Sequence, residues 1–311
     1  MRPRRHAPYV AGMFRRIVLA ARGDDTRSRD ALALAIALAG PHTELVIAGV
    51  WVSPLGAGDA LYANSVEGQL ERELERLREA APEGLFTRVH VAGSTSPARG
   101  LHHLVERERA DLLVVGPADP EQRRADGPDL ALGLLHDCPC AVAVAPAGYA
   151  AQPPRPPARV LVGWDGSQEA ADALEAAVRI TEDACGSLRL VDVVEPPFTV
   201  AQMPWAGAAE ADPAWMAELV DAAEQSVEEA RRQVGGRAPV ETEVVKGIAG
   251  EELARCAADA DLVVTGSRRF GSLRRLVLGS TSAVVLHHAS VPVLVLPRGA
   301  RVPQRPAAEA R

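Results

Sequence analysis

The stretch Ala110-Asp-Leu-Leu-Val-Val-Gly116 returns in the second half of the chain as Ala260-Asp-Leu-Val-Val-Thr-Gly266. Each copy is followed by a short apolar run that ends in proline, at Cys140–Pro146 and at Val291–Pro297. Each half also opens on an apolar run that leads into a Gly/Asp turn. A repeat of roughly 140 residues has the size of one domain rather than of a solenoid unit, so the chain is expected to hold two domains.

In both halves, apolar segments that read as buried strands alternate with segments of helical period. This alternation predicts an α/β fold, in which a parallel sheet carries helices on both faces. In the second half the expected strands are 159–163, 187–194, 240–245, 261–265 and 291–296, and the expected helices are 168–183, 213–234, 250–258 and 281–288. In the first half the expected strands are 17–21, 44–51, 87–91, 111–115 and 141–144, and the expected helices are 27–39, 64–80 and 96–109.

The predicted domains are 14–148 and 158–298, and the Pro-rich segment 149–157 is predicted to be an extended linker. The net charge of −7 argues against broad binding of nucleic acid, which needs a basic surface. The longest unbroken apolar stretch, 31–39, is too short to span a bilayer. Residues 1–12 are basic, but no long apolar segment follows them. The chain is therefore expected to be cytoplasmic, with no membrane segment.

Two groups of residues attract attention without predicting a site. Cys138, Cys140, Cys185 and Cys256 fit no zinc or thioredoxin spacing well, so we expect free, buried thiols in a reducing cytoplasm. The pairs His102-His103 and His287-His288 lie on predicted helices, where neighbouring side chains point apart and do not easily share a metal ion.

In an open α/β sheet, ligands bind at the carboxyl ends of the strands, where the winding direction reverses. With a strand order of 3-2-1-4-5, that point lies between the first and the fourth strands. Two polar turns meet there in the second half, Trp164-Asp165-Gly166-Ser167 and Gly266-Ser267-Arg268-Arg269. We therefore expect a ligand site between these two turns.

The second of these turns opens a segment with the character of a phosphate-binding loop. Gly266 would let the backbone approach a ligand, and Gly279-Ser280 would place the positive end of a helix against the loop. Arg268 and Arg269 would add charge-assisted hydrogen bonds. Asp165 is an acceptor suited to a ribose hydroxyl, an adenine amino group or, through water, Mg²⁺. Each feature alone is more often a cap or a plain turn, so the hypothesis rests on their joint occurrence.

The segments 162–167, 260–266, 273–280 and 291–297, in this order and spacing, resemble the universal stress protein family. The whole chain resembles the tandem form, with two such domains in one polypeptide. The resemblance implies two Rossmann-like, adenine nucleotide alpha hydrolase-like domains, each with a five-stranded parallel sheet of order 3-2-1-4-5. It also implies that domains pair through their last strands, and that members which bind ATP carry the pattern G-x2-G-x9-G-[S/T].

The resemblance assigns nucleotide-binding positions in the second half. Gly266 matches the first glycine of the pattern, and Gly279-Ser280 matches the last pair. The second glycine falls on Arg269, whose side chain either clashes with phosphate or binds it. By the same comparison Asp165 holds the nucleotide and the backbone of Val193 meets adenine. The implied site comprises Gly163, Trp164, Asp165, Val193, Thr265, Gly266, Arg268, Arg269, Gly279, Ser280 and Thr281.

The first half departs further from the pattern. Gly116-Pro-Ala-Asp-Pro lacks phosphate-loop character, and Gly127 is followed by Pro128 instead of Ser or Thr. At the turn after the first strand, carboxylates are present at Asp24-Asp25 but in a displaced register. We expect no conventional ATP site in this domain, which would serve as a pairing partner or as an unrelated binding surface.

These observations predict a universal stress protein that binds ATP or AMP, with or without Mg²⁺, in its second domain. The ligand would alter association with an unknown protein partner. No catalytic residue is identified, so an enzyme is not predicted. The two domains would pair within the chain, and pairing of two chains is left open. One alternative is a stress scaffold that binds no nucleotide, which Arg269 favours. Another is an enzyme that adenylates a small substrate, with 195–212 as its lid.

Overall fold

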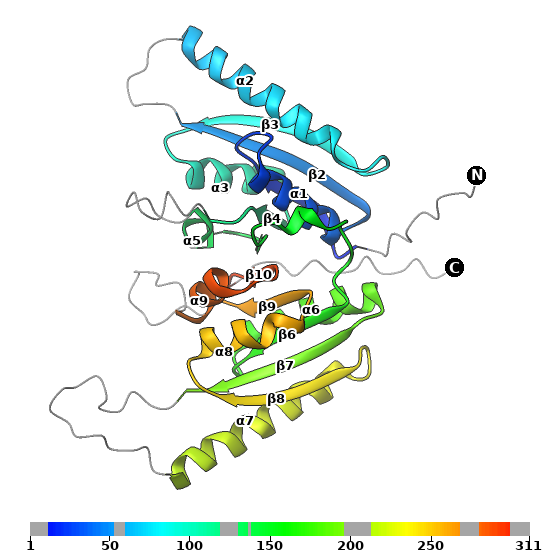
Figure 1. Ribbon diagram of the computed structural model, residues 1–311, viewed down its shortest axis with the longest axis vertical. Helices are drawn as coiled ribbons and strands as arrows, with labels where there is room; N and C mark the ends of the chain where they lie inside the picture. Colours follow the sequence, from blue (N-terminus) through cyan, green and yellow to red (C-terminus); the bar gives the residue numbers. More distant parts are fainter. Residues whose placement is uncertain are drawn as a thin grey trace, which may run out of the picture. The chain divides into compact units, whose positions relative to one another are not determined.

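A computed structural model of the chain describes residues 12–52, 60–118, 130–135, 138–195, 213–267 and 280–298 (Figure 1). The described residues form two compact units, an N-terminal unit that extends to Pro156 and a C-terminal unit that begins at Pro157. Strands and helices alternate along each unit. Each unit is therefore an α/β fold, which confirms the predicted fold class.

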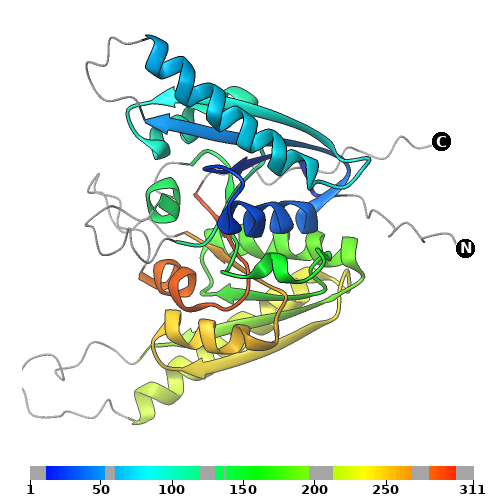
Figure 2. The same ribbon diagram turned by 45° about the horizontal axis from the view of Figure 1, so that its top comes forward.

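The N-terminal unit contains a sheet of order β3-β2-β1-β4-β5, and the strand pairs within it are parallel. In Figure 2, helix α2 lies along β2 and β3. The elements are β1 (Phe14–Ala20), α1 (Thr26–Leu38), β2 (Ala39–Val52), α2 (Ala60–Glu79), β3 (Phe86–Ser94), α3 (Pro97–Glu108), β4 (Leu112–Val115), α5 (Leu130–Leu135), β5 (Ala141–Val144) and the 3₁₀ turn η1 (Tyr149–Ala151).

The C-terminal unit repeats this plan with the order β8-β7-β6-β9-β10, again with parallel pairs. In chain order, both units therefore have the predicted strand order 3-2-1-4-5. The elements are β6 (Arg159–Trp164), α6 (Gln168–Ala184), β7 (Ser187–Val194), α7 (Pro213–Val234), β8 (Val240–Lys246), α8 (Ala249–Cys256), the 3₁₀ turn η2 (Ala257–Asp259), β9 (Leu262–Gly266), α9 (Ser280–His288) and β10 (Val293–Leu296).

Each sheet is covered by helices on both faces. In the N-terminal unit, a side chain at Gly49 would meet Leu74 of α2, whereas Val50 lies against Gly100 of α3. Neighbouring residues of a strand point to opposite faces, so α2 and α3 lie on opposite sides of this sheet. All residues of β4, β5 and β10 are buried, as expected for strands that are covered on both faces.

Among the helices that the structure describes, none combines the length and the apolar character needed to cross a bilayer.

In the C-terminal unit the element ends agree with the sequence prediction to within two residues. In the N-terminal unit β1 begins three residues and α2 four residues earlier than predicted, and β3 ends three residues later. Two further differences in this unit have a clear cause. β2 begins at Ala39 rather than at residue 44, because the Thr43 hydroxyl donates to the Phe14 carbonyl at 2.6 Å and holds this segment beside β1. The sequence analysis does not find α5, because its residues Leu-Ala-Leu-Gly-Leu-Leu are uniformly apolar or small and show no helical period.

The expected extended linker begins instead with η1. The Asp30 carboxylate of α1 accepts the backbone N–H groups of Gly148 and Ala150 at 2.9 and 2.8 Å. Asp30 is buried, and these bonds satisfy it. The beginning of the Pro-rich segment is thus attached to the N-terminal unit through a side chain more than a hundred positions away in sequence.

One cysteine prediction is wrong. Cys138, Cys140 and Cys256 are buried free thiols, but Cys185 is exposed. Cys185 is the C-cap of α6 and adopts a left-handed conformation with φ of 51°, beyond the buried face of the helix.

The aspartate of the repeated Ala-Asp-Leu motif holds the beginning of the first strand in each unit. Asp111 Oδ2 accepts the backbone N–H groups of Arg15-Arg16 at 2.8 and 3.0 Å. Asp261 Oδ2 accepts those of Ala158-Arg159 at 3.1 and 2.8 Å. Burial alone would raise the pKa of Asp261, but the hydrogen bonds from Arg159 and Ala158 hold that pKa below its usual value. We call this contact the aspartate clasp; it aligns the first strand with the fourth.

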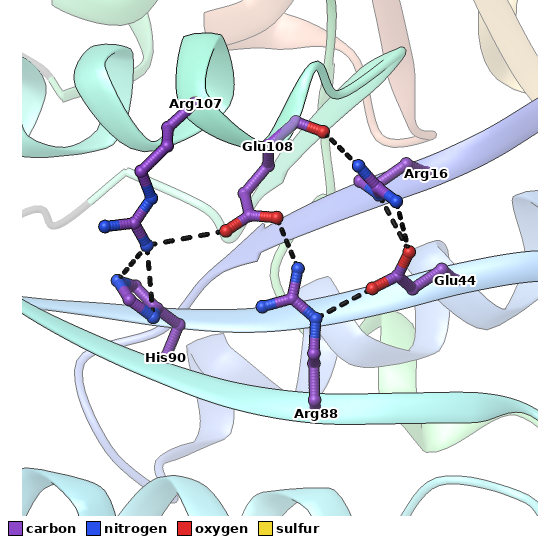
Figure 3. A network of polar contacts seen from close by, with 6 residues as sticks. All are labelled: Arg16, Glu44, Arg88, His90, Arg107 and Glu108. Carbon is purple, nitrogen blue, oxygen red and sulfur yellow. Dashed lines mark hydrogen bonds and ion pairs between the residues drawn. The ribbon is translucent and has the colours of Figure 1, made fainter.

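A polar network joins the carboxyl end of α3 to the sheet of the N-terminal unit (Figure 3). Arg88 of β3 pairs with Glu44 of β2 at 2.7 Å and also with Glu108, the last residue of α3. Arg16 of β1 binds Glu44 at 2.7 Å and donates to the Glu108 carbonyl oxygen at 2.5 Å. The network therefore fastens α3 to three strands.

His90 of β3 lies beside this network, next to Arg107 (Figure 3). Burial, and after it the charge of Arg107, lowers the pKa of His90. The imidazole stays neutral in the folded chain at a pH where the unfolded chain already binds a proton there. The resulting stability is present above the unfolded pKa of about 6.5 and is lost as the pH falls toward the folded pKa.

We predict that His90→Gln reduces the loss of stability between pH 7.5 and pH 5.5. The free energy of unfolding, measured by urea denaturation at both pH values, should fall less in the variant than in the unsubstituted chain, by under about 1 kcal/mol. His42→Gln, at an exposed position of β2, is the matched control and should leave the pH difference unchanged. An identical pH difference in His90→Gln and in the unsubstituted chain would contradict the assignment.

Candidate functional site

A cavity of about 280 Å³ opens at the carboxyl ends of β6, β7 and β9 in the C-terminal unit. The register places these ends at one edge, because Val162 of β6 pairs with Leu190 of β7 and with Val264 of β9. This is the point between the first and fourth strands where the sequence predicts a ligand. Of the predicted site residues, the cavity is lined by Gly163, Trp164, Asp165, Val193, Thr265, Gly266 and Thr281.

The remaining predicted residues are not brought to the cavity by any described contact. Arg268, Arg269 and Gly279 lie outside the described residues. Ser280 is the first residue of α9. The role of Arg269, at the position of the missing glycine, therefore stays a prediction. The candidate lid 196–212 also lies outside the described residues, whereas Glu195 before it is described.

Gly163 lines the cavity near the carboxyl end of β6. Gly163 shares a sheet face with Val191 and Thr265, its neighbours on the adjoining strands. A Cβ built on Gly163 would lie 3.0 Å from Cδ1 of Leu253 in α8 and 3.4 Å from Cγ2 of Thr265. Counted from the aspartate clasp, the N-terminal unit has Ala20 at this position. The N-terminal unit thus has a methyl group at the position where the C-terminal unit packs Leu253 closely against the strand.

Trp164 turns its indole to the opposite face of the sheet. Its Nε1 donates to the Ser226 hydroxyl of α7 at 2.8 Å, and the residue is only 8% exposed. Because Gly163 faces α8 and Trp164 faces α7, the tryptophan anchors the end of β6 rather than presenting its ring to a ligand on the Gly163 side.

The turn after β6 is a well-formed helix cap and also a wall of the cavity. Asp165 Oδ1 accepts the N–H of Ser167 at 2.9 Å, and Ser167 Oγ accepts the N–H of Ala170 at 3.1 Å. Asp165 is exposed and lines the cavity. The common explanation of an Asp-Gly-Ser sequence, a capped turn, is therefore correct here, and it leaves the carboxylate at the predicted place.

The corresponding turn of the N-terminal unit uses its carboxylates locally. Asp25 accepts the N–H of Ser28 at 2.7 Å as the N-cap of α1. Asp24 pairs with Arg29 at 2.7 Å, and the hydrogen bond from that guanidinium lowers the pKa of Asp24. The displaced register seen in the sequence thus corresponds to acids that close a turn.

The sequence analysis missed two acidic residues of the cavity, Asp192 near the end of β7 and Glu195 directly after it. Glu195 Oε1 accepts the N–H of Ala249 at 2.7 Å and so caps α8, whose N-cap residue Ile248 makes no side-chain cap. In the described part of the lining, every ionisable side chain is acidic: Asp165, Asp192 and Glu195. The sequence did carry a signal for them, because a carboxylate at or directly after the end of a predicted strand lies at the same carboxyl edge of the sheet.

The end of β9 and the beginning of α9 each place a polar group beside the cavity. Thr265 is 4% exposed, and its Oγ1 has no hydrogen-bond partner among the described residues. Ser282 of α9, another residue that the sequence analysis missed, donates to the Gly266 carbonyl oxygen at 3.4 Å. The beginning of α9 therefore lies against the end of β9, where its free N–H groups can receive an anion.

Gly266 has a packing role that its counterpart in the N-terminal unit shares. A Cβ on Gly266 would lie 2.4 Å from the carbonyl oxygen of Glu169 in the first turn of α6. A Cβ on Gly116 would lie 2.5 Å from the carbonyl oxygen of Arg27 in α1. Since the N-terminal unit has no phosphate-loop sequence after Gly116, the glycine of the repeated motif is required by packing and does not by itself indicate a ligand.

Comparison with known proteins agrees with this architecture. The chain matches the model of the Universal stress protein family twice, over residues 13–146 and 157–297. A universal stress protein of Mycobacterium tuberculosis is 28% identical over 285 residues, which cover 86% of this chain and 94% of that protein. A second one from the same species is 34% identical over 163 residues, covering 47% of this chain and 51% of that protein. The crystal structure of a universal stress protein from Archaeoglobus fulgidus has the same fold, with a TM-score of 0.65 and 19% identity over 92% of this chain and 97% of that chain.

We predict that Gly266→Ala and Gly116→Ala each lower the free energy of unfolding by about 1–3 kcal/mol, because the added methyl group displaces a helix backbone. The measurement is urea denaturation without any ligand. Gly68→Ala in α2 is the control: its Cβ would meet only the end of Arg72, at 3.5 Å, and should stabilise the helix slightly. Unchanged stability in Gly266→Ala would mean that this glycine is there for a ligand alone.

Proposed function

Because the chain belongs to the universal stress protein family, we propose that the cavity of its C-terminal unit binds an adenine nucleotide, ATP or AMP, with or without Mg²⁺. In this proposal the bound ligand alters how the chain associates with protein partners in a stress response. The observation that carries it is the cavity over Gly163, which lies at the carboxyl edge between the first and fourth strands, where open α/β sheets hold their ligands.

The described lining offers partners for the parts of a nucleotide. The side chains of Val193 and Leu253 give an apolar wall for a base, and Asp165 is an acceptor for ribose hydroxyls. The buried hydroxyl of Thr265 is available for a further hydrogen bond. The N-terminus of α9 suits phosphate. The described volume is near the lower end of the range for small-molecule sites, about 300–1,000 Å³, which suits AMP or part of ATP.

The carboxylates of Asp165 and Glu195 in the lining affect which charge state of the nucleotide is bound. Like charges a few ångströms apart repel, and the repulsion is stronger near a protein than in bulk water. AMP carries less negative charge than ATP, and Mg²⁺ reduces the charge of ATP. The acidic lining therefore favours AMP or Mg²⁺-bound ATP over free ATP, and the resemblance places Arg268 and Arg269 where they would offset the remaining phosphate charge.

In this proposal the chain acts in the cytoplasm as a nucleotide-binding protein and not as an enzyme. The family resemblance also suggests that the two domains pair through their last strands and leaves open whether two chains pair. A scaffold that binds no nucleotide is the alternative. It is favoured by Arg269 at a glycine position of the pattern and by the acidic lining, and the titrations below distinguish it.

We predict that ATP binds at least about tenfold more tightly with Mg²⁺ than with a chelator, whereas the affinity for AMP changes little. Isothermal titration calorimetry of the full chain, first checked by mass spectrometry for carried-over nucleotide, measures both. Glu195→Gln, which keeps an oxygen for the Ala249 N–H, should reduce the Mg²⁺ dependence of ATP binding. Equal ATP affinity in both buffers would contradict the electrostatic argument, and no binding of either nucleotide would favour the scaffold.

We predict that Asp165→Ala abolishes nucleotide binding without unfolding the chain, which circular dichroism can check. Asp24→Ala, in the corresponding turn of the N-terminal unit, is the matched control and should leave binding unchanged. Arg269→Gly should strengthen binding if the arginine obstructs the loop and weaken it if the arginine holds phosphate. If neither Asp165→Ala nor Arg269→Gly changes the affinity, the proposed site is wrong.

A further inference from the structure

Cys138 and Cys140 bring two sulfur atoms together in the N-terminal unit. Their Sγ atoms are 3.6 Å apart, and the residues are 4% and 2% exposed. The chain bends at Pro139 and Cys140 before β5 begins, so the two thiols lie on the same side of the segment. A disulfide needs the sulfurs at about 2.05 Å, which rotation of the two side chains can approach without unfolding the unit.

Packing does not require two cysteines here, and the described residues add no metal ligand to the pair. Leu113 pairs with Val142, and Val263 pairs with Val293, so the C-terminal counterparts of the two cysteines are Ala289 and Val291. Alanine and valine therefore serve the same place in the repeated fold. Within the described residues no third His, Cys, Asp or Glu joins the pair in a metal-binding group, whereas a structural zinc site takes four ligands.

We propose that Cys138 and Cys140 form a thiol–disulfide redox site, which a small hydroperoxide oxidises and a dithiol reductant restores. Burial restricts the oxidant to a small molecule such as hydrogen peroxide. The ring that the disulfide closes spans only three residues, so it gains little from loop entropy and is easily reduced.

The two thiols have different parts in this reaction. The contact between the two sulfur atoms lowers the pKa of Cys138. The same contact, together with burial, raises the pKa of Cys140. Cys138 is therefore the nucleophile and Cys140 the thiol that keeps its proton. The negative charge of Glu106 raises the pKa of Cys138 and that of Asp111 raises the pKa of Cys140, so both oppose a thiolate and the reaction needs an excess of oxidant.

The reaction balances in two steps. The Cys138 thiolate attacks one peroxide oxygen, the O–O bond breaks, and the leaving hydroxide takes a proton to form water, which gives a sulfenic acid at Cys138. The Cys140 sulfur then attacks the Cys138 sulfur. The S–S bond forms, the S–O bond breaks, and the Cys140 proton leaves with the hydroxide as a second water molecule. Peroxide is reduced, and the two thiols are oxidised. A dithiol reductant then reduces the disulfide back to two thiols by thiol–disulfide exchange.

The test uses the full chain with its four cysteines. The protein is treated with excess hydrogen peroxide and denatured in an alkylating reagent, and the peptide that contains Cys138 and Cys140 is measured by mass spectrometry. We expect both thiols to be lost together, with a peptide mass lower by two hydrogen atoms, and both to return after treatment with dithiothreitol. Cys256, a single buried thiol, is the internal control; it should escape oxidation and therefore be fully alkylated after denaturation.

Two outcomes would overturn the proposal. One is that Cys138 and Cys140 stay fully alkylated under conditions that oxidise the exposed Cys185. The other is that either thiol is lost without the mass of an internal disulfide. In Cys138→Ala the remaining Cys140 should stay alkylated under the same treatment. The double variant Cys138→Ala/Cys140→Val copies the C-terminal counterparts and checks that the unit folds without sulfur.

Discussion

In both units the glycine at the carboxyl end of the fourth strand, the residue after β4 or the last residue of β9, must lack a side chain, because a helix carbonyl occupies the place of its Cβ. Gly116 meets Arg27 in this way, and Gly266 meets Glu169. The aspartate clasp sets the register at the opposite ends of the same strands. These two contacts bring the turn after the first strand beside the end of the fourth, and every residue of the candidate site depends on that placement.

The shared frame builds a cavity in the C-terminal unit through a few differences. Gly163, at the position of Ala20, lets Leu253 pack close to β6, and Asp165 lines the cavity, whereas Asp24 and Asp25 close a turn and cap a helix. The repeated motif is thus a property of the fold, and the function depends on the residues that the two units do not share. The same reasoning separates Cys138 and Cys140 from their counterparts in the C-terminal unit.

Much of the fold could be predicted because buried parallel strands are continuous apolar runs and because the chain repeats itself. The edge that holds the cavity followed from strand order, and Asp165 was found there. Features fixed by long-range contacts could not be predicted: η1 depends on the carboxylate of Asp30, and the beginning of α8 is capped by Glu195 from outside that helix. The packing role of Gly266 was hidden for the same reason, since its partner is a backbone atom of another element.

The central claim is that a nucleotide binds over Gly163. It is tested most directly by illuminating the chain with an azido analogue of ATP, with Mg²⁺ present, and locating the labelled peptides by mass spectrometry. The account predicts labels on the ends of β6, β7 or β9 that excess ATP or AMP removes. Labels confined to the N-terminal unit, or labels that ATP and AMP do not remove, would contradict it.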